Sequence, residues 1–164
     1  MENNTTLINF TELTLKEKKM ILSWRNNKNI KIWMYDNLDI KLQHHIEFIK
    51  SLKMIKDKRY FLVKIKNIYI GVINFTYIDY INKECQFGLY ANPKLKGVGK
   101  ILLNIIIDYA FKNLDMTTLK AEVFRKNIKA IKLYKKFHFT EIGNKEFHNK
   151  DIIIMELDNI LYSE

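Results

Sequence analysis

Residues 92–100 read Asn-Pro-Lys-Leu-Lys-Gly-Val-Gly-Lys and have the composition of an anion-binding turn. They separate a strand-like run, residues 84–90, from a helix-like run, residues 101–112. A glycine turn that ends in a helix N-terminus directs several backbone N–H groups at one point, beside the positive end of the helix dipole. Gly97 and Gly99 keep that point open, because a side chain there would hold a ligand away from the backbone. The turn is therefore predicted to bind a phosphate group.

A second candidate lies further along the chain, where Asn127, Ala130 and Tyr134 are spaced to share one face of a helix. Ala130 would let a ligand approach the helix closely, while the amide and the phenol would offer polar groups beside it. The same spacing fits a purely structural interpretation, in which Asn127 caps the helix and Tyr134 packs at its rim. The pattern alone leaves both interpretations open.

The elements that must position these residues follow from hydrophobic periodicity and turn residues. Thr14 and Glu17 form a capping box for a first helix that ends near Asn26. Asp39 is expected to cap a second helix that extends to about Leu52, and residues 29–35 fit either a helical turn or a loop. Strands are expected at residues 6–10, 60–65, 69–77, 84–90, 119–124, 139–142 and 152–157, and further helices at 101–112 and 127–136.

This order of elements predicts a mixed α/β or α+β domain built around one sheet. A doubly wound dinucleotide fold is excluded, because the glycine turn follows three meandering strands and not the first strand of a βαβ unit. Residues 1–164 are expected to form a single domain, since the length and the 48% hydrophobic content suit one buried core.

The net charge of +10 suits a phosphorylated ligand, although the lysines are spread along the chain and also fit a general compositional bias. No basic run or nucleic-acid motif is present, so a nucleic-acid partner is not expected. The lone cysteine, Cys85, excludes an internal disulfide and suits a buried apolar position. The polar first residues and the lack of a long apolar run predict a cytoplasmic protein without membrane contact.

Together these motifs resemble the GNAT superfamily of acetyl-CoA-dependent N-acetyltransferases. The pyrophosphate loop of that family, Gln/Arg-x-x-Gly-x-Gly/Ala, is matched by residues 94–99, with lysine in the first place. Asn127, Ala130 and Tyr134 match the later signature of an asparagine, a small residue and a tyrosine. His138 replaces the glycine that often follows, so it is expected to take a left-handed conformation at the end of the helix.

The resemblance implies a central, mostly antiparallel sheet that is splayed between its fourth and fifth strands and flanked by helices. Acetyl-CoA would bind at the splay as co-substrate, with no metal. Tyr134 would protonate the departing thiolate, for which a phenol with a pKa of about 10 is a suitable donor. The implied cofactor-binding residues are Leu89, Ala91, Leu95, Lys96, Gly97, Val98, Gly99, Lys100, Asn127, Ala130 and Tyr134.

The acceptor amine must also lose a proton, and Glu84, Glu122 and His45 are the candidate bases. Glu122 lies in an otherwise apolar strand beside the splay, where burial would raise its pKa. It is the expected catalytic base, acting directly or through water. Glu84 is expected to be an exposed or salt-bridged residue.

The N-terminal half resembles the GNAT enzymes of bacterial pseudaminic acid biosynthesis, through residues 24–26, 32–35, 43–49 and 59–62. This likeness implies acetylation of the 4-amino group of UDP-4-amino-4,6-dideoxy-N-acetyl-β-L-altrosamine, on the route to the sugar that decorates flagellin. Arg25 would neutralise the diphosphate, and Trp33 with its two neighbours would form an apolar wall. The implied substrate-binding residues are Arg25, Trp33, Met34, Tyr35, His45, Asn74, Thr76 and Tyr90.

Two other functions remain compatible with the sequence. The chain could acetylate peptide N-termini or polyamines, although a polyamine site should be rich in carboxylates and the acceptor segments are basic and aromatic. It could also be a degenerate, CoA-binding module, against which the presence of Tyr134 and both loop glycines argues. Members of the superfamily often form dimers, so a homodimer is compatible with the resemblance.

Overall fold

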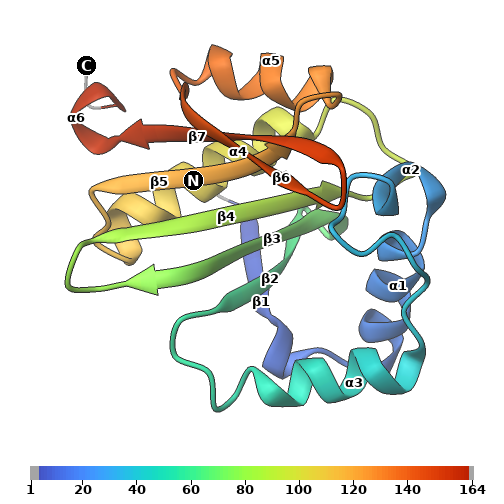
Figure 1. The fold of residues 1–164 in the computed structure, drawn as a ribbon. Helices are drawn as coiled ribbons and strands as arrows, with labels where there is room; N and C mark the ends of the chain where they lie inside the picture. The colour runs from blue at the N-terminus through green and yellow to red at the C-terminus, as the bar shows by residue number, and fades with distance from the viewer. Residues whose placement is uncertain (1–3, 163–164) are drawn as a thin grey trace.

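Seven strands form one sheet in the order β1-β2-β3-β4-β5-β7-β6 (Figure 1). The computed structural model describes residues 4–162. The strands are β1 (Thr5–Asn9), β2 (Arg59–Ile65), β3 (Ile68–Asp79), β4 (Glu84–Ala91), β5 (Thr118–Phe124), β6 (Thr140–Phe147) and β7 (Lys150–Asp158). The helices are α1 (Leu15–Arg25), α2 (Lys28–Lys31), α3 (Leu42–Ser51), α4 (Gly99–Asp108), α5 (Ile128–Lys136) and α6 (Asn159–Tyr162), with a 3₁₀ turn at Phe10–Glu12 and a π-helical turn at Tyr109–Asn113.

The sheet is antiparallel except between β4 and β5, which are parallel and pair over only three residues. Their ladder ends at the pair Gln86 and Lys120. Beyond that pair β4 stays bonded to β3 as far as Ala91, and β5 stays bonded to β7 as far as Phe124. The two central strands therefore diverge, which confirms the predicted splay between the fourth and fifth strands.

Two hydrophobic cores cover the opposite faces of the sheet. The larger joins α4 and α5 to alternate residues of the central strands, among them Phe75, Phe87 and Ala121. The smaller joins α1 and α3 to Leu62 of β2 and Val72 of β3. Because side chains alternate across a strand, the same strands supply both cores. Figure 1 shows α1 and α3 gathered beside the β1–β3 end of the sheet.

Local sequence signals account for most element boundaries. The Thr14 side chain accepts a hydrogen bond from the Glu17 amide at 3.2 Å, and the Glu17 carboxylate accepts one from the Thr14 amide at 2.8 Å, which confirms the capping box. The hairpin between β2 and β3 turns at Lys66 and Asn67, both with positive φ, as a two-residue turn of the primed type requires.

Several expected boundaries were wrong. Asp39 does not cap α3, because it pairs with Lys31 at 2.8 Å, and the N-cap position falls to Lys41 without a side-chain bond. Strand β6 begins after Phe139 and continues to Phe147, well past the predicted end at Ile142. The expected turn at residues 149–151 is shorter, since β7 already begins at Lys150 and the turn is made by His148 and Asn149 with positive φ.

Candidate active site

One cleft of about 1590 Å³ contains every residue predicted to hold the cofactor or the acceptor. Its lining includes the turn before α4, the divergent ends of β4 and β5, the face of α5 that carries Tyr134, and the acceptor residues on α1, α3 and β3. The segment between α2 and α3, residues 32–41, supplies Trp33, Met34 and Tyr35 to the same cleft. Residues far apart in the sequence therefore share one binding space.

The turn before α4 is built to present backbone N–H groups. Gly97 has a φ of 75°, a conformation that other residues adopt only with strain. The first hydrogen bond of α4 runs from the Leu102 amide to the Val98 carbonyl at 3.0 Å, so the preceding N–H groups have no acceptor within the helix. The turn is fixed by Asn92, whose side chain accepts from the Lys94 amide and donates to the Tyr69 carbonyl, both at 3.0 Å.

Tyr134 projects from α5 into the cleft, with its ring packed against Phe87 and Phe139 at centroid distances of 5.3 and 5.8 Å. Burial raises the pKa of the phenol to about 12, so the hydroxyl keeps its proton at neutral pH. Asn127 caps α5 by accepting a hydrogen bond from the Ala130 amide at 3.3 Å. His138 ends the helix with a φ of 70°, which confirms its predicted left-handed conformation.

The Glu122 carboxylate lies at the splay and is held by side chains from three other segments. It accepts hydrogen bonds from the Tyr35 hydroxyl and, at 3.0 Å, from the Gln86 amide, and it pairs with Lys145 at 2.8 Å. Burial acts to raise the pKa of Glu122, but the hydrogen bonds from Lys145, Tyr35 and Gln86 outweigh it and lower that pKa. The predicted rise of this pKa was therefore wrong.

The other two candidate bases have different surroundings. Glu84 pairs with Lys120 at 2.8 Å, as expected of a salt-bridged strand residue. His45 is buried on α3, and its Nε2 donates to the Lys18 carbonyl at 3.1 Å, because a carbonyl oxygen can only accept. Burial lowers the pKa of His45, so the ring is neutral at pH 7. One ring nitrogen thus fixes α3 to α1, although the side chain also borders the cleft.

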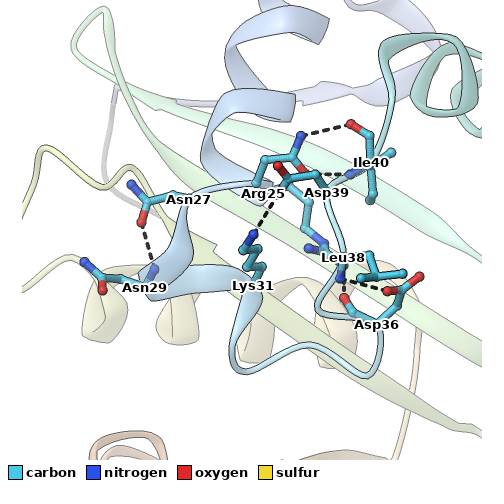
Figure 2. A network of polar contacts seen from close by, with 9 residues as sticks. Arg25, Asn27, Asn29, Lys31, Asp36, Leu38, Asp39 and Ile40 are labelled. Atoms are coloured by element: carbon cyan, nitrogen blue, oxygen red, sulfur yellow. Dashed lines mark hydrogen bonds and ion pairs between the residues drawn. The ribbon is translucent and has the colours of Figure 1, made fainter.

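Arg25 ends α1 and lines the part of the cleft that carries the predicted acceptor residues, which we call the acceptor half. Its Nη2 donates to the Asp36 carbonyl at 2.7 Å, whereas its buried Nη1 has no partner among residues 4–162. Figure 2 shows how neighbouring contacts hold the α2–α3 segment beside it, including the ion pair between Lys31 and Asp39. Asn26 adds a double hydrogen bond to the backbone of Ile40, at 2.8 and 2.9 Å. The segment is therefore fixed at its base, beside an Arg25 side chain that lines the cleft and whose Nη1 is buried without a partner among residues 4–162.

The floor of the acceptor half is formed by one face of β3 and β4. Asn74 and Thr76 lie two residues apart on β3, and Gly88 and Tyr90 lie two apart on β4, so each pair shares a face. Gly88 makes room for the Asn74 amide, because a Cβ at that position would lie 2.9 Å from its nitrogen. Burial raises the pKa of Tyr90, which therefore contributes a neutral hydroxyl.

The charge of the cleft is strongly one-sided. Glu122 is the only carboxylate in its lining within the described part of the chain. The cations that line it are Arg25, Lys96, Lys100, Lys129, Lys132 and Lys136. Such a surface favours a ligand with several phosphate groups.

Several residues of the site were not predicted. Gln86 and Lys145 contact Glu122, Asn92 holds the glycine turn, and Phe48 and Tyr60 add aromatic walls to the acceptor half. The Asn-Pro dipeptide that begins the turn was a usable signal for Asn92, since asparagine often bonds to the backbone two residues ahead. Lys145 had no such signal, because its partner lies 23 residues away on another strand.

Other kinds of site find no support in residues 4–162. No helix in this range has the length and apolar composition needed to cross a bilayer. The same range holds no group of three or more His, Cys, Asp or Glu side chains placed to bind a metal. Burial raises the pKa of the Cys85 thiol to about 12, which makes it a poor nucleophile.

Residues 8–140 match the acetyltransferase (GNAT) domain family, and the chain belongs to that family. It is 49% identical over 144 residues to acetyltransferase PseH of Campylobacter jejuni subsp. jejuni serotype O:23/36 (strain 81-176). The matched region covers 87% of this chain and 90% of that protein. The crystal structure of C. jejuni N-acetyltransferase PseH in complex with acetyl coenzyme A superposes with a TM-score of 0.79 and 42% identity, covering 94% of this chain and 99% of that one. The chain is thus a GNAT acetyltransferase related to PseH.

The fold is shared more widely than the sequence. Spermidine N-acetyltransferase from Vibrio cholerae, in complex with CoA and spermine, superposes with a TM-score of 0.88 over 99% of this chain and 100% of that one, but it is only 24% identical. At this identity the likeness shows a shared fold and does not identify the acceptor of this chain.

Proposed function

We propose that this protein transfers the acetyl group of acetyl-CoA to the 4-amino group of UDP-4-amino-4,6-dideoxy-N-acetyl-β-L-altrosamine, a step in pseudaminic acid biosynthesis. The observation that carries the proposal is the 49% identity to PseH over 144 residues, which cover 87% of this chain and 90% of that protein. A GNAT fold alone would support only an unspecified acetyltransferase.

The cofactor half of the cleft fits acetyl-CoA. The amides of residues 95–100 would hold the diphosphate at the N-terminus of α4, where Gly97 and Gly99 leave the backbone accessible. The pantetheine amides would bond to the unpaired edges of β4 and β5 near Leu89 and Ala91, as an added strand does. Asn127 and Ala130 would face the cofactor arm from α5.

The acceptor half fits a nucleotide sugar. The Arg25 guanidinium would turn toward the diphosphate, because its Nη1 is buried without a partner among residues 4–162, which is costly, and a contact with an anion removes that cost. Trp33 and Met34 would contact the deoxy-sugar methyl or the uracil, and His45 would border the nucleotide. Asn74, Thr76 and Tyr90 would bond to the sugar hydroxyl and acetamido groups from the sheet.

The reaction needs one base and one acid, and the two ends of the splay supply them. The acceptor amine attacks the thioester carbonyl carbon, and its nitrogen gains positive charge as the new C–N bond forms. Glu122, which stays ionised because its pKa is lowered, would stabilise that charge and take the acidic proton, directly or through water. As the C–S bond breaks, Tyr134 would give its proton to the thiolate sulfur.

The polyamine alternative is less well supported by the cleft. A polyamine carries several positive charges, and the only carboxylate lining the cleft within residues 4–162 is already paired with Lys145. The acceptor half instead offers an arginine donor and aromatic walls. A neutral or anionic acceptor therefore suits these residues better than a polycation.

We further propose that residues 1–164 act as one catalytic domain, since strands from both ends of the chain join the same sheet. A cytoplasmic location agrees with the free, buried Cys85. We also propose a homodimer, because many members of the superfamily form dimers. Sedimentation velocity of the purified protein tests this, and a sedimentation coefficient that corresponds to a monomer would contradict it.

A mass-spectrometric assay tests the acceptor directly. The protein is incubated with acetyl-CoA and the UDP-amino sugar, and separately with spermidine and with a short peptide. The proposal expects one added acetyl group on the nucleotide sugar and none on the others. Acetylation of spermidine or the peptide alone would refute the sugar assignment, and acetyl-CoA binding without any product would favour a binding module.

A further inference from the structure

The Glu122 carboxylate occupies a position where an unpaired charge would be unstable. Its side chain is only 14% exposed, and it lies beside the splay with Phe124 two residues away on the same strand face. In such surroundings desolvation favours the protonated acid, which cannot accept a proton from the acceptor amine. Some other group must keep Glu122 charged.

Lys145 is the cation that contacts Glu122. Of the groups that bond to this carboxylate, Tyr35 and Gln86 are neutral, and Lys145 alone is charged, at 2.8 Å. Lys120, two residues from Glu122 on the same face of β5, instead pairs with Glu84 at 2.8 Å. Lys150 lies over the Phe124 ring at 5.1 Å, so it too is directed elsewhere.

The position of Lys145 in the sheet makes the contact specific. Glu122 is on β5 and pairs with Ile154 of β7, whereas Lys145 is on β6 and pairs with Ile152 of β7. Lys145 therefore reaches across a whole strand, about 10 Å at the usual strand spacing, and also two residues along the sheet to contact Glu122. A long basic side chain is needed to make that contact. The pairing of β6 with β7 does not itself require such a side chain at this position.

The same strand also fixes the neutral donor. Phe147 of β6 packs against the Tyr35 ring at a centroid distance of 4.8 Å, and Lys145 lies 5.7 Å from the centroid of that ring. The ring of Phe124 on β5 also packs edge-on against Tyr35, at a centroid distance of 5.8 Å. Strand β6, exposed along nearly its whole length, thus contributes two residues to the surroundings of the carboxylate.

From this geometry we propose that Lys145 is a positioning residue, which holds the Glu122 carboxylate ionised and directed at the acceptor nitrogen. The proposal deepens the proposed function, because it rests on Glu122 taking the acceptor proton. Lys145 itself does not line the cleft, so it acts through Glu122 and not on the substrate.

The test compares Lys145→Met and Lys145→Arg with Lys112→Met, which removes a different lysine pair, Lys112 with Asp108 at 3.0 Å, outside the cleft. Lys145→Met should lower kcat by about tenfold, because Glu122 would lose part of its effect as a general base. The KM values for acetyl-CoA and for the acceptor should each change by less than about threefold. The acid limb of the kcat profile should move to higher pH. Lys145→Arg should recover at least about half of the activity, because an arginine also spans the strand, and the control should match the wild type.

A second readout is independent of the acceptor. In carbon-13 NMR titrations, with the Glu122 signal identified by its loss in Glu122→Gln, the pKa of that carboxyl should be higher in Lys145→Met than in the wild type. An unchanged kcat, acid limb and Glu122 titration, with only a lower Tm, would overturn the proposal and leave Lys145 as a structural tie. If the wild type acetylates a different amine, the sugar assignment fails, and the same variants are compared with that amine.

Discussion

Replacement of Tyr134 by phenylalanine separates chemistry from folding in this site. The ring contacts with Phe87 and Phe139 do not involve the hydroxyl, and that hydroxyl has no hydrogen-bond partner among the described residues. Tyr134→Phe should therefore change the free energy of unfolding by less than about 1 kcal/mol. The variant should keep its fold and its affinity for acetyl-CoA.

The effect on the reaction should be much larger. Without the phenol the thiolate must leave unprotonated, and the loss of a positioned acid typically costs about 100-fold or more in rate. This corresponds to about 2.7 kcal/mol in the activation free energy. Because the pKa of Tyr134 is raised to about 12, the wild-type donor keeps its proton as the pH rises, and kcat should not fall through this group until the pH approaches that value.

The assay is steady-state release of free CoA with the UDP-amino sugar, together with a thermal unfolding curve and a binding isotherm for acetyl-CoA. We expect kcat to fall by about two orders of magnitude, while Tm and the acetyl-CoA Kd stay close to those of the wild type. A kcat within threefold of the wild type would refute the assignment of Tyr134 as the acid. A large drop in Tm would show that the residue mainly supports the fold.

Three further predictions concern other parts of the molecule. Gly97→Ala should raise the acetyl-CoA KM by about tenfold and lower the free energy of unfolding by about 1 kcal/mol, because alanine is strained at a positive φ. Gly143 also has open space around it but no positive φ, so the control Gly143→Ala should change neither the KM nor the free energy of unfolding. Arg25→Met should raise the acceptor KM by about tenfold or more through the lost diphosphate contact, with an unchanged acetyl-CoA KM, and equal rises of both would count against an acceptor-specific role. The lowered pKa of His45 means that the unfolded chain binds this proton more readily than the folded one, so stability is complete above about pH 6.5 and is lost as the pH falls toward the folded pKa. Chemical unfolding at pH 7.5 and 5.5 should show this loss in the wild type and a smaller one in His45→Gln, and equal losses would exclude His45 as its source.

The parts of the structure set by local signals could be predicted from the sequence. The capping box of Thr14 and Glu17, the glycine turn and the left-handed His138 depend on residues a few positions apart, and each is confirmed. The splay followed from the family resemblance, and the register of β4 and β5 confirms it.

Side-chain pairings that depend on how the chain folds back on itself could not be predicted in this way. Asp39 was expected to cap α3, but a tertiary ion pair with Lys31 takes its carboxylate. The pKa of Glu122 was expected to rise from burial, and it falls because Tyr35 and Lys145 meet it from segments far away in the sequence. Hydrophobic periodicity carries no information about such pairings, which only the arrangement of the strands determines.

A crystal structure of the protein with CoA and the UDP-amino sugar is the most direct test of the proposed function. We expect the sugar amine between the thiol of CoA and the Glu122 carboxylate, the diphosphate of the nucleotide at Arg25, and the Tyr134 hydroxyl directed at the sulfur. We also expect residues 95–100 to hold the diphosphate of CoA. A nucleotide bound outside the cleft, or an amine that lies nearer to another base than to Glu122, would contradict the central claim.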